Sequence, residues 1–207
     1  MLSRLDPEAR KLLLRIPLGA VVALVLWFAG GGEVYGRLLT WATEAVVRLV
    51  ESPSTTFLTW EDGAIIARRV DLSTRSQLPV FSASTFDWNT VLLFALYLSV
   101  PGAGTRRGLL RGLAAHALLL VLQVTHLSLA LEDLYARQLG PWSEAAYSRW
   151  QRELFATSRY FFDIALVYAL PFVIWGILVL VPWARSRAQA SADRPAPKPG
   201  RRKKRKG

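Results

Sequence analysis

A long apolar stretch in the middle of the chain, Leu109–Leu131, reads LLRGLAAHALLLVLQVTHLSLAL and carries one charged residue, Arg111. Its apolar residues follow one another around all sides of a helix, rather than alternating as in a half-buried strand. A hydrocarbon core about 30 Å thick is crossed by about 20 helical residues, and this stretch exceeds that length. It therefore predicts a transmembrane helix.

Three further apolar runs lie on either side of this stretch. They are Ile16–Gly32, which has no charge, Phe86–Pro101, with only Asp87, and Tyr160–Ala184, with only Asp163. The last run is long enough to span a membrane alone, whereas the first two need flanking polar residues at headgroup level. The sequence predicts an all-α membrane protein with four transmembrane helices, together with a small extracytoplasmic β-hairpin and amphipathic helices.

Composition agrees with this class and excludes several chemistries. Hydrophobic residues make up 52% of the 207 residues, which is more than most soluble domains of this size contain. The chain has no cysteine. Disulfides, cysteine metal sites and thiol nucleophiles are therefore excluded.

The run Ile16–Gly32 admits a second interpretation, a cleaved signal peptide. It follows basic residues, and Ala29-Gly30-Gly31 offers small residues for cleavage. The run is longer than the usual apolar region of a signal peptide, which favours a retained span. The predicted topology of the other spans is the same in both cases.

The distribution of Lys and Arg predicts the orientation. With both termini in the cytoplasm, the inner segments 1–15, 101–111 and 185–207 hold 17 basic residues against three acids, while the outer segments hold nine against eleven. Cytoplasmic loops carry an excess of Lys and Arg. We therefore expect a transmembrane domain over residues 1–184 of a bacterial inner-membrane protein, with both termini inside.

The chain ends in the polybasic segment RPAPKPGRRKKRKG. Its prolines, and its lack of residues that could fill a core, predict a disordered cytoplasmic tail over 185–207. Each Lys or Arg held near an anionic leaflet contributes about 1 kcal/mol of attraction. The residues expected to bind anionic lipid headgroups are Arg201, Arg202, Lys203, Lys204, Arg205 and Lys206. A nucleic-acid arm is disfavoured because no aromatic residue lies among the basic ones to stack on bases.

The first outer loop, residues 33–85, begins with a helical pattern. Residues 33–51 predict an amphipathic helix that lies on the outer membrane face or caps the bundle. Its predicted apolar face consists of Leu38, Trp41, Ala45, Val46 and Leu49. Further along, Asp62-Gly63 between two β-rich stretches predicts a hairpin.

The second outer loop, residues 132–159, is rich in aromatic residues, among them Trp142, Tyr147 and Trp150. Ser143 is a candidate N-cap for a helix there. Aromatic side chains at this place suit a helix at headgroup level. Packing into the protein core is the alternative.

Polar side chains within the predicted spans are candidate functional residues, because they are costly to keep in a membrane. They are Asn89, His116, Gln123, His126 and Asp163. His116 and Gln123 are seven residues apart and share one face of a helix. Asn89, His126 and Asp163 are predicted to lie at similar depth on three different helices.

Of these, His126 and Asp163, with Arg159 above them, are the candidates for catalysis. A His–Asp pair can orient an imidazole for proton transfer. The interpretation we favour is that these groups join helices, each hydrogen bond contributing about 0.6 kcal/mol. For His116, a bond to a neighbouring helix is likewise favoured over a metal. No HExxH, GxSxG or phosphate-binding glycine loop occurs, so we expect no metal, no cofactor and no catalysis.

The order of the predicted elements resembles that of a known family. The three later spans contain FDWNTVLLFALYLSVP, RRGLLRGLAAHALLLVLQVTHLSLAL and RYFFDIALVYALPFVIWGILVL. With the basic start, the first span and the outer β segment, residues 10–184 resemble the exosortase H-associated membrane proteins, small bacterial multi-pass proteins encoded beside an exosortase. The resemblance lies in architecture and composition. It implies an accessory to protein sorting at the envelope with an exosortase-like partner, and not the peptidase, whose catalytic cysteine has no counterpart here.

Two functions from different classes follow. The favoured one is a non-catalytic membrane protein that assembles with another envelope protein through its outer loops and helix faces. The alternative is a small membrane enzyme or transporter subunit that uses His126 and Asp163.

Overall fold

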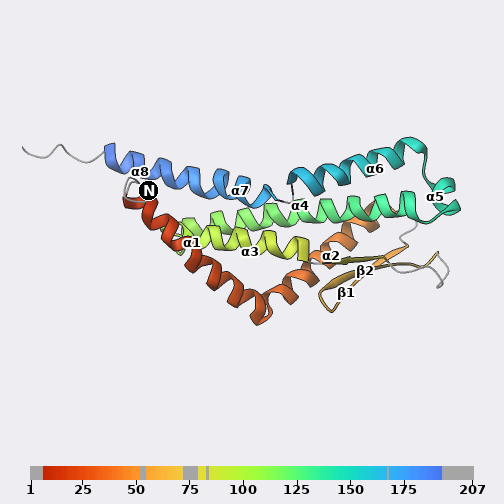
Figure 1. Ribbon diagram of the computed structural model, residues 1–207, viewed down its shortest axis with the longest axis horizontal. Helices are drawn as coiled ribbons and strands as arrows, with labels where there is room; N and C mark the ends of the chain where they lie inside the picture. The colour runs from red at the N-terminus through yellow and green to blue at the C-terminus, as the bar shows by residue number, and fades with distance from the viewer. Residues whose placement is uncertain (1–6, 52–54, 72–78, 83, 167, 193–207) are drawn as a thin grey trace, which may run out of the picture.

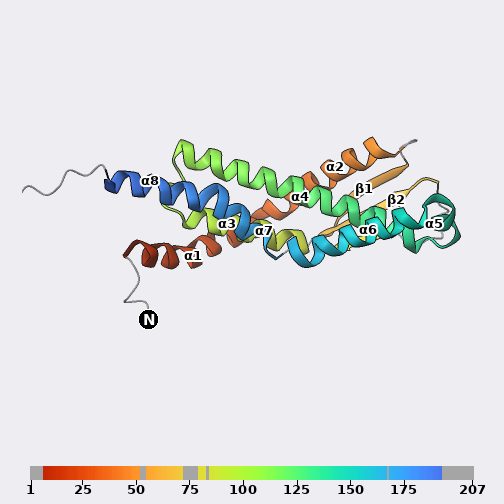
Figure 2. The ribbon, with the colours of Figure 1, turned by 90° about the horizontal axis from the view of Figure 1, so that it is seen from above.

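The computed structural model describes residues 7–51, 55–71, 79–82, 84–166 and 168–192. The chain is mostly helical, with one small antiparallel sheet (Figure 1). Helix α4 (Arg106–Gln138) runs along the length of the molecule, and the other helices pack beside it (Figures 1 and 2).

The two ends of the molecule differ. The sheet and the short helix α5 (Pro141–Ala146) lie at one end, called here the sheet end. The start of α1 (Pro7–Leu26) and the end of α8 (Val181–Ala192) lie together at the other, called the basic end (Figures 1 and 2). The connection from α3 (Ser84–Ser99) to α4 is also at the basic end.

The first apolar run does not form a straight helix. Helix α1 continues through a π-helical turn, Trp27–Gly31, into α2 (Gly32–Val50), and the backbone bends at Gly30, whose φ is 116°. Glycine adopts positive φ readily because it has no Cβ. The bend sets α1 and α2 in the V shape seen in Figure 1, so that α1 packs on α3 while α2 packs on the sheet and α4.

A helix therefore forms at the position predicted for 33–51, but the predicted face is not the one that packs. The buried residues of α2 are Gly36, Leu39, Thr40, Thr43 and Val47. On the predicted face, Trp41 is 70% exposed and Leu49 is 85% exposed. Small and β-branched residues let α2 approach the sheet closely, and the larger apolar residues stay on the outside of the molecule.

The predicted hairpin is confirmed, and a third strand joins it. Strands β1 (Thr56–Glu61) and β2 (Ala64–Arg69) pair in antiparallel fashion. Asp62 and Gly63 both have positive φ, 48° and 76°, as a two-residue hairpin turn of type I′ requires. Strand β3 (Val80–Ser82) pairs with β2. Three residues are too few to show a strand pattern in the sequence, which is why β3 was not predicted.

The sequence had suggested one continuous helix over the run 160–184, but the structure interrupts it. Helix α6 (Arg149–Phe161) leads into a π-helical turn, Phe162–Leu166, and α7 (Leu170–Trp175) begins after a break. Pro171, in the first turn of α7, explains the break because proline lacks an N–H and its ring excludes the helical carbonyl four residues earlier.

The last described helix, α8, follows a second π-helical turn, Gly176–Leu180, and runs to Ala192. Residues 185–192, predicted as the start of a disordered tail, are therefore helical. The apolar helix that precedes them nucleates helix into this polar sequence. The expected lipid-binding residues 201–206 lie outside the described part of the chain.

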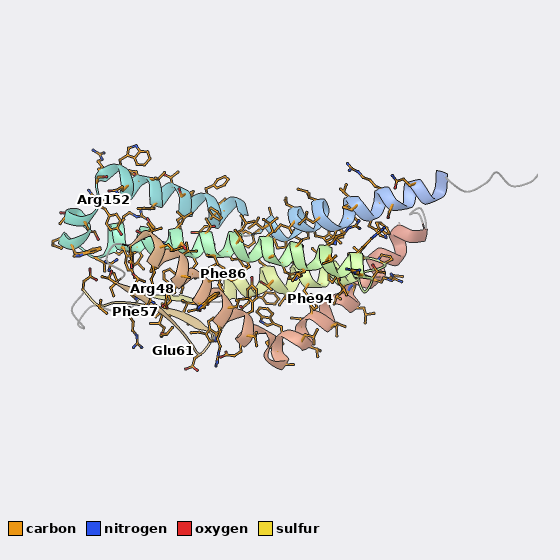
Figure 3. All side chains as sticks on the ribbon, turned by 180° about the vertical axis from the view of Figure 1, so that it is seen from behind. Arg48, Phe57, Glu61, Phe86, Phe94 and Arg152 are labelled. Carbon is orange, nitrogen blue, oxygen red and sulfur yellow. The ribbon has the colours of Figure 1, made fainter. Side chains whose placement is uncertain are left out.

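Two helical stretches, Leu14–Val50 and Arg106–Gln138, are long and apolar enough to cross a membrane. Many large apolar side chains on α1, α4 and α7 are exposed. Leu18 on α1 and Leu113 on α4 each expose more than 60% of their surface, and Phe172 on α7 exposes 51%. The labelled charged residues of Figure 3, among them Arg152, lie at the sheet end.

Candidate functional site

Two of the predicted polar residues are joined directly. His126 Nε2 on α4 lies 2.7 Å from Asp163 Oδ1 in the π-helical turn after α6. The ring of Phe162 stacks on the imidazole, with ring centroids 5.5 Å apart and planes 11° apart. The ring centroid of Phe86 lies 5.6 Å from that of the imidazole. Two aromatic rings and one carboxylate therefore hold the imidazole of His126 in a fixed orientation.

The pair continues into an alternating series of basic and acidic side chains, called here the charged chain. It consists of His126, Asp163, Arg159, Asp133 and Arg137. Arg159 Nε lies 3.4 Å from Asp163 Oδ2, and Arg159 Nη1 donates to Asp133 Oδ2 at 3.0 Å. Asp133 is fully buried and also accepts from Arg137 Nη2 at 2.6 Å. Two guanidinium groups thus compensate the buried carboxylate of Asp133, and α4 is tied to α6 along several turns.

The charged chain joins helices, and its His–Asp pair has the geometry to move a proton. Neither His126 nor Asp163 is among the residues that line the cavities of about 670, 540 and 200 Å³. Within the described ranges, no group of three His, Asp or Glu side chains is arranged to hold a metal ion.

Gln123 also joins helices. Its Oε1 accepts from the Tyr35 hydroxyl of α2 at 2.5 Å, and its Nε2 donates to the Phe86 carbonyl oxygen of α3 at 3.1 Å. Gln123 is buried, so these bonds satisfy an amide that would be costly inside the protein. One side chain of α4 therefore connects to both α2 and α3.

His116 and Asn89 do not take part in the charged chain. His116 Nδ1 donates to the Gly112 carbonyl oxygen, 2.8 Å away in its own helix, and not to a neighbouring helix as we had expected. The carbonyl four residues earlier is the nearest acceptor for a side chain that tilts toward the helix N-terminus. Asn89 is buried on α3, and no hydrogen bond joins it to His126 or Asp163.

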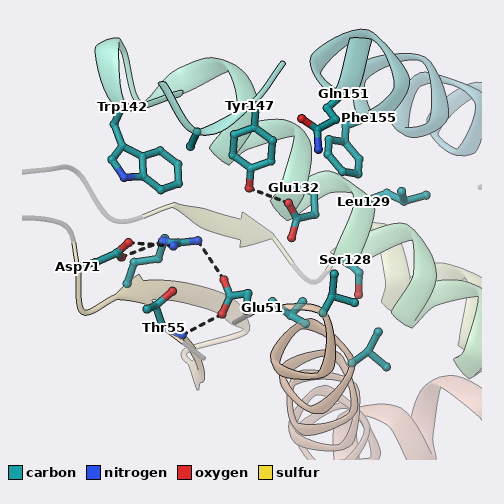
Figure 4. A pocket seen from close by; sticks show the side chains of 15 residues that line it. Glu51, Thr55, Asp71, Ser128, Leu129, Glu132, Trp142, Tyr147, Gln151 and Phe155 are labelled. Atoms are coloured by element: carbon teal, nitrogen blue, oxygen red, sulfur yellow. Dashed lines mark hydrogen bonds and ion pairs between the residues drawn. The ribbon is translucent and has the colours of Figure 1, made fainter. Parts of the chain in front are cut away.

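Sequence reasoning missed a second site at the sheet end. It is a cavity of about 670 Å³ between the ends of α2 and β2, the C-terminal part of α4, and the chain of α5 and α6 (Figure 4). We call it the outer pocket. Its lining includes Val46, Val50, Glu51, Thr55, Arg69, Asp71, Leu129, Glu132, Trp142, Tyr147 and Phe155.

Arg69 anchors one side of the outer pocket. It donates to Glu51 Oε1 at 3.0 Å and, through two nitrogens, to the carboxylate of Asp71 at 2.9 Å each. Its guanidinium carbon lies 4.8 Å from the ring centroids of both Tyr135 and Trp142, a cation–π geometry. Burial acts to lower the pKa of Arg69, but the hydrogen bond and charge of Asp71, with the charge of Glu51, raise it overall.

Glu132 occupies the other side. The Tyr147 hydroxyl donates to Glu132 Oε2 at 2.8 Å (Figure 4). Burial raises the pKa of Tyr147, and the charge of Glu132 raises it further, so the phenol stays a donor. In the part of the chain that the structure describes, no Lys, Arg or His forms an ion pair with Glu132. Burial raises the pKa of Glu132, while the hydrogen bond from Tyr147 and the charge of Arg69 act to lower it. Glu132 makes no ion pair with Arg69, the cation that Glu51 and Asp71 share, so a further cation beside it would favour its ionised form.

The sequence did contain a signal for this site. Side chains two residues apart in a strand point to the same face, so Arg69 shares a face with Ile65 and Ala67, which are fully buried. An arginine on the buried face of a strand predicts a carboxylate partner. Glu132 directly follows the apolar run 109–131, which places it at the C-terminal end of that run.

Comparison with known proteins does not identify the chain. No protein-family model, no curated protein and no solved structure matches it.

Proposed function

We propose that the chain is a non-catalytic multi-pass membrane protein that assembles with another envelope protein. The observation that carries this proposal is the set of large apolar side chains exposed along α1, α4 and α7. Soluble monomers rarely expose contiguous apolar patches larger than a few hundred Å², because each Å² left in water costs about 25 cal/mol. Lipid tails around these helices remove that cost.

The proposed topology has spans at 16–32, 86–101, 109–131 and 160–184, with both termini in the cytoplasm of an inner membrane. Three basic segments support it: the start of α1, the α3–α4 connection and the end of α8 all lie at the basic end (Figure 2). A break such as the one before Pro171 is tolerated in membrane spans where neighbouring helices pack beside it, and α7 packs against α3 and α4.

Reporter fusions test the topology. Fusions after Gly207 and within Gly102–Gly108 should report the cytoplasm, and fusions near Gly63 and Gly140 the outer side, because Lys and Arg are retained inside. A cytoplasmic report at Gly63 would contradict the four-span arrangement.

The proposed partner is an exosortase-type membrane protein, and this part of the proposal rests on the order of elements that the chain shares with exosortase-associated proteins. Affinity capture of the tagged full chain from its native membrane tests it. We expect a multi-pass protein of that type to be enriched over a capture with an unrelated tagged multi-pass protein. Equal recovery in both captures would contradict the assembly role.

The geometry of His126 and Asp163 favours one alternative function, a small membrane enzyme or transporter subunit. Asp163 lies in a π-helical turn, and such turns are frequent at functional sites. His126→Ala and Asp163→Ala discriminate between the two. A catalytic pair loses cellular activity while the protein still accumulates and captures its partner, whereas a structural pair loses accumulation or partner capture.

A further inference from the structure

The lining of the outer pocket carries an excess of negative charge. Three carboxylates, those of Glu51, Asp71 and Glu132, face one guanidinium, that of Arg69. Glu51 and Asp71 already bind Arg69. Glu132 accepts one neutral hydrogen bond from Tyr147, so its charge is the one that a ligand can neutralise.

The rest of the lining is apolar and aromatic. Val46, Val50 and Leu129 supply aliphatic surface. Trp142, Tyr147 and Phe155 form a row of rings, with successive centroids 6.0 Å apart. Aromatic faces attract cations, and a volume of about 670 Å³ is typical of a pocket that encloses a few side chains.

Building on the assembly role proposed above, we propose that the outer pocket binds a basic side chain, flanked by apolar residues, of a partner protein. The cation pairs with Glu132 and lies against the ring of Tyr147. The flanking side chains fill the aliphatic surface between α2 and α4. Interfaces of this kind place charged anchors in water-excluding, aromatic surroundings.

The same charges disfavour a phospholipid as the occupant. The ammonium of an aminolipid is accompanied by a phosphate, which the three carboxylates would repel. The one guanidinium that could receive a phosphate, that of Arg69, is engaged by Glu51 and Asp71. A peptide side chain brings positive charge without this penalty.

The position of the pocket suits a membrane-anchored partner. Glu132 is the first residue after the proposed span 109–131, so the pocket opens where polypeptides leave the bilayer. Beside it on α2, Leu49 and Val50 are exposed. These residues provide apolar surface for the stretch of the partner that adjoins its basic side chain.

Peptide binding to the full chain in neutral detergent micelles tests the proposal. The probe is fluorescently labelled acetyl-Leu-Arg-Leu-amide, and the control is the same peptide with citrulline, a neutral analogue of arginine. By fluorescence anisotropy, we expect the arginine peptide to bind the wild-type chain at least about tenfold more tightly, since removing one partner of a desolvated charge pair costs at least this factor. Equal binding of the two peptides would overturn the proposal.

Two variants locate the effect. Glu132→Gln should abolish the preference for arginine over citrulline, while Glu153→Gln, which removes an exposed carboxylate of α6 outside the pocket lining, should retain it. An unchanged preference in Glu132→Gln overturns the proposal. If that variant does not fold, the comparison of the two peptides on the wild-type chain still decides.

Lipid competition supplies the last arm. Mixed micelles containing phosphatidylethanolamine should not displace the arginine peptide more than micelles containing phosphatidylcholine; specific displacement by the aminolipid would identify a lipid occupant and overturn the proposal. Failure here is distinguishable from failure of the assembly role. Reporter fusions and partner capture are read on the wild-type chain without reference to Glu132.

Discussion

The carboxylate of Asp133 has no contact with water, yet it lies between Arg159 and Arg137, which are 35% and 47% exposed. Truncating one partner of a buried ion pair costs about 3–5 kcal/mol. Here we expect the lower end for Asp133→Ala, about 3 kcal/mol, because both arginines can turn to solvent. Thermal unfolding of the purified variant in detergent measures the effect as a lowered melting temperature.

The matched control is Glu144→Gln, which removes an exposed carboxylate on α5, away from the charged chain. Surface substitutions of this kind change stability by less than about 0.5 kcal/mol. If both variants melt together with the wild type, the charged chain does not stabilise the packing of α4 on α6.

Asp71 makes the sheet end sensitive to acid. Its hydrogen bond from Arg69 lowers the pKa of the carboxyl in the folded protein, and the charge of Arg69 adds to this. A folded-state pKa below the unfolded value of about 3.9 stabilises the protein above that value, and the contribution is lost as pH falls through the folded pKa. The melting temperature of the wild type should exceed that of Asp71→Asn at pH 7, and the difference should begin to shrink as pH falls below about 3.9 and continue to shrink through the folded-state pKa. A difference that is constant over this range would contradict the linkage.

Among single residues, the sequence predicted the ionisable ones that lie within apolar runs, because the cost of burying such a residue can be recognised before its partner is known. His126 and Asp163 stand out because ionisable groups are rare in apolar runs, and their contact follows from their similar depth. Glu132 was missed because it lies just outside the apolar run 109–131, and Arg69 because it lies at the end of strand β2. Charged residues are common at both kinds of position. Their site depends on the packing of β2 against α4, which no local pattern records.

At the scale of elements, the bend between α1 and α2 depends on one backbone angle. Gly30 has φ 116° and open space where a Cβ would lie, so Gly30→Ala is strained by its backbone and not by a clash. Non-glycine residues held at positive φ cost about 1–3 kcal/mol. We expect Gly30→Ala to lower the melting temperature accordingly.

Gly176→Ala is the control for this prediction. Gly176 also has open space around its Cβ position but has helical φ, and alanine is the better helix former by up to about 1 kcal/mol. This variant should be neutral or slightly stabilising. Equal destabilisation by both changes would show that the angle at Gly30 is not the cause.

The elements best predicted were those with local chemistry of their own. Asp62-Gly63 specifies its hairpin turn, and the apolar run 109–131 specifies the middle of α4. The extension of α4 to Gln138 and the burying face of α2 were not predicted, because α4 there packs on α5 and α6 and the face of α2 is set by contacts with the sheet. Pro171 did carry a local signal for the break in the last apolar run, which hydropathy alone conceals.

At the scale of the whole molecule, orientation rests on several basic segments at once. Deleting Arg194–Gly207 removes part of the charge but leaves Arg185, Arg106 and Arg107 at the basic end. We expect the truncated chain to insert with unchanged orientation, because these residues still favour the cytoplasm. A reporter fused after Asp193 measures the orientation of the truncated chain, and an inverted report would assign orientation to the tail alone.

The tail itself is expected to bind lipid. A synthetic peptide of residues 194–207 should bind anionic vesicles and not neutral ones, and added salt should release it because the attraction falls off within about 8 Å at physiological ionic strength. Nucleic acid binding is also sensitive to salt, so salt release alone does not distinguish lipid binding from nucleic acid binding. Crosslinking in cells distinguishes the two. Capture of RNA or DNA by the intact chain but not by the truncated one would contradict the lipid interpretation.

The place of Glu132, at the first turn beyond the proposed span, has a kinetic consequence. A partner anchored in the same bilayer searches for the outer pocket in two dimensions, with its basic residue already at the right height. Tethering of this kind raises the effective concentration of a ligand to the millimolar range. A pocket with only modest affinity for the isolated peptide is then sufficient to keep the anchored partner bound, and it releases free peptides from the surrounding solution rapidly.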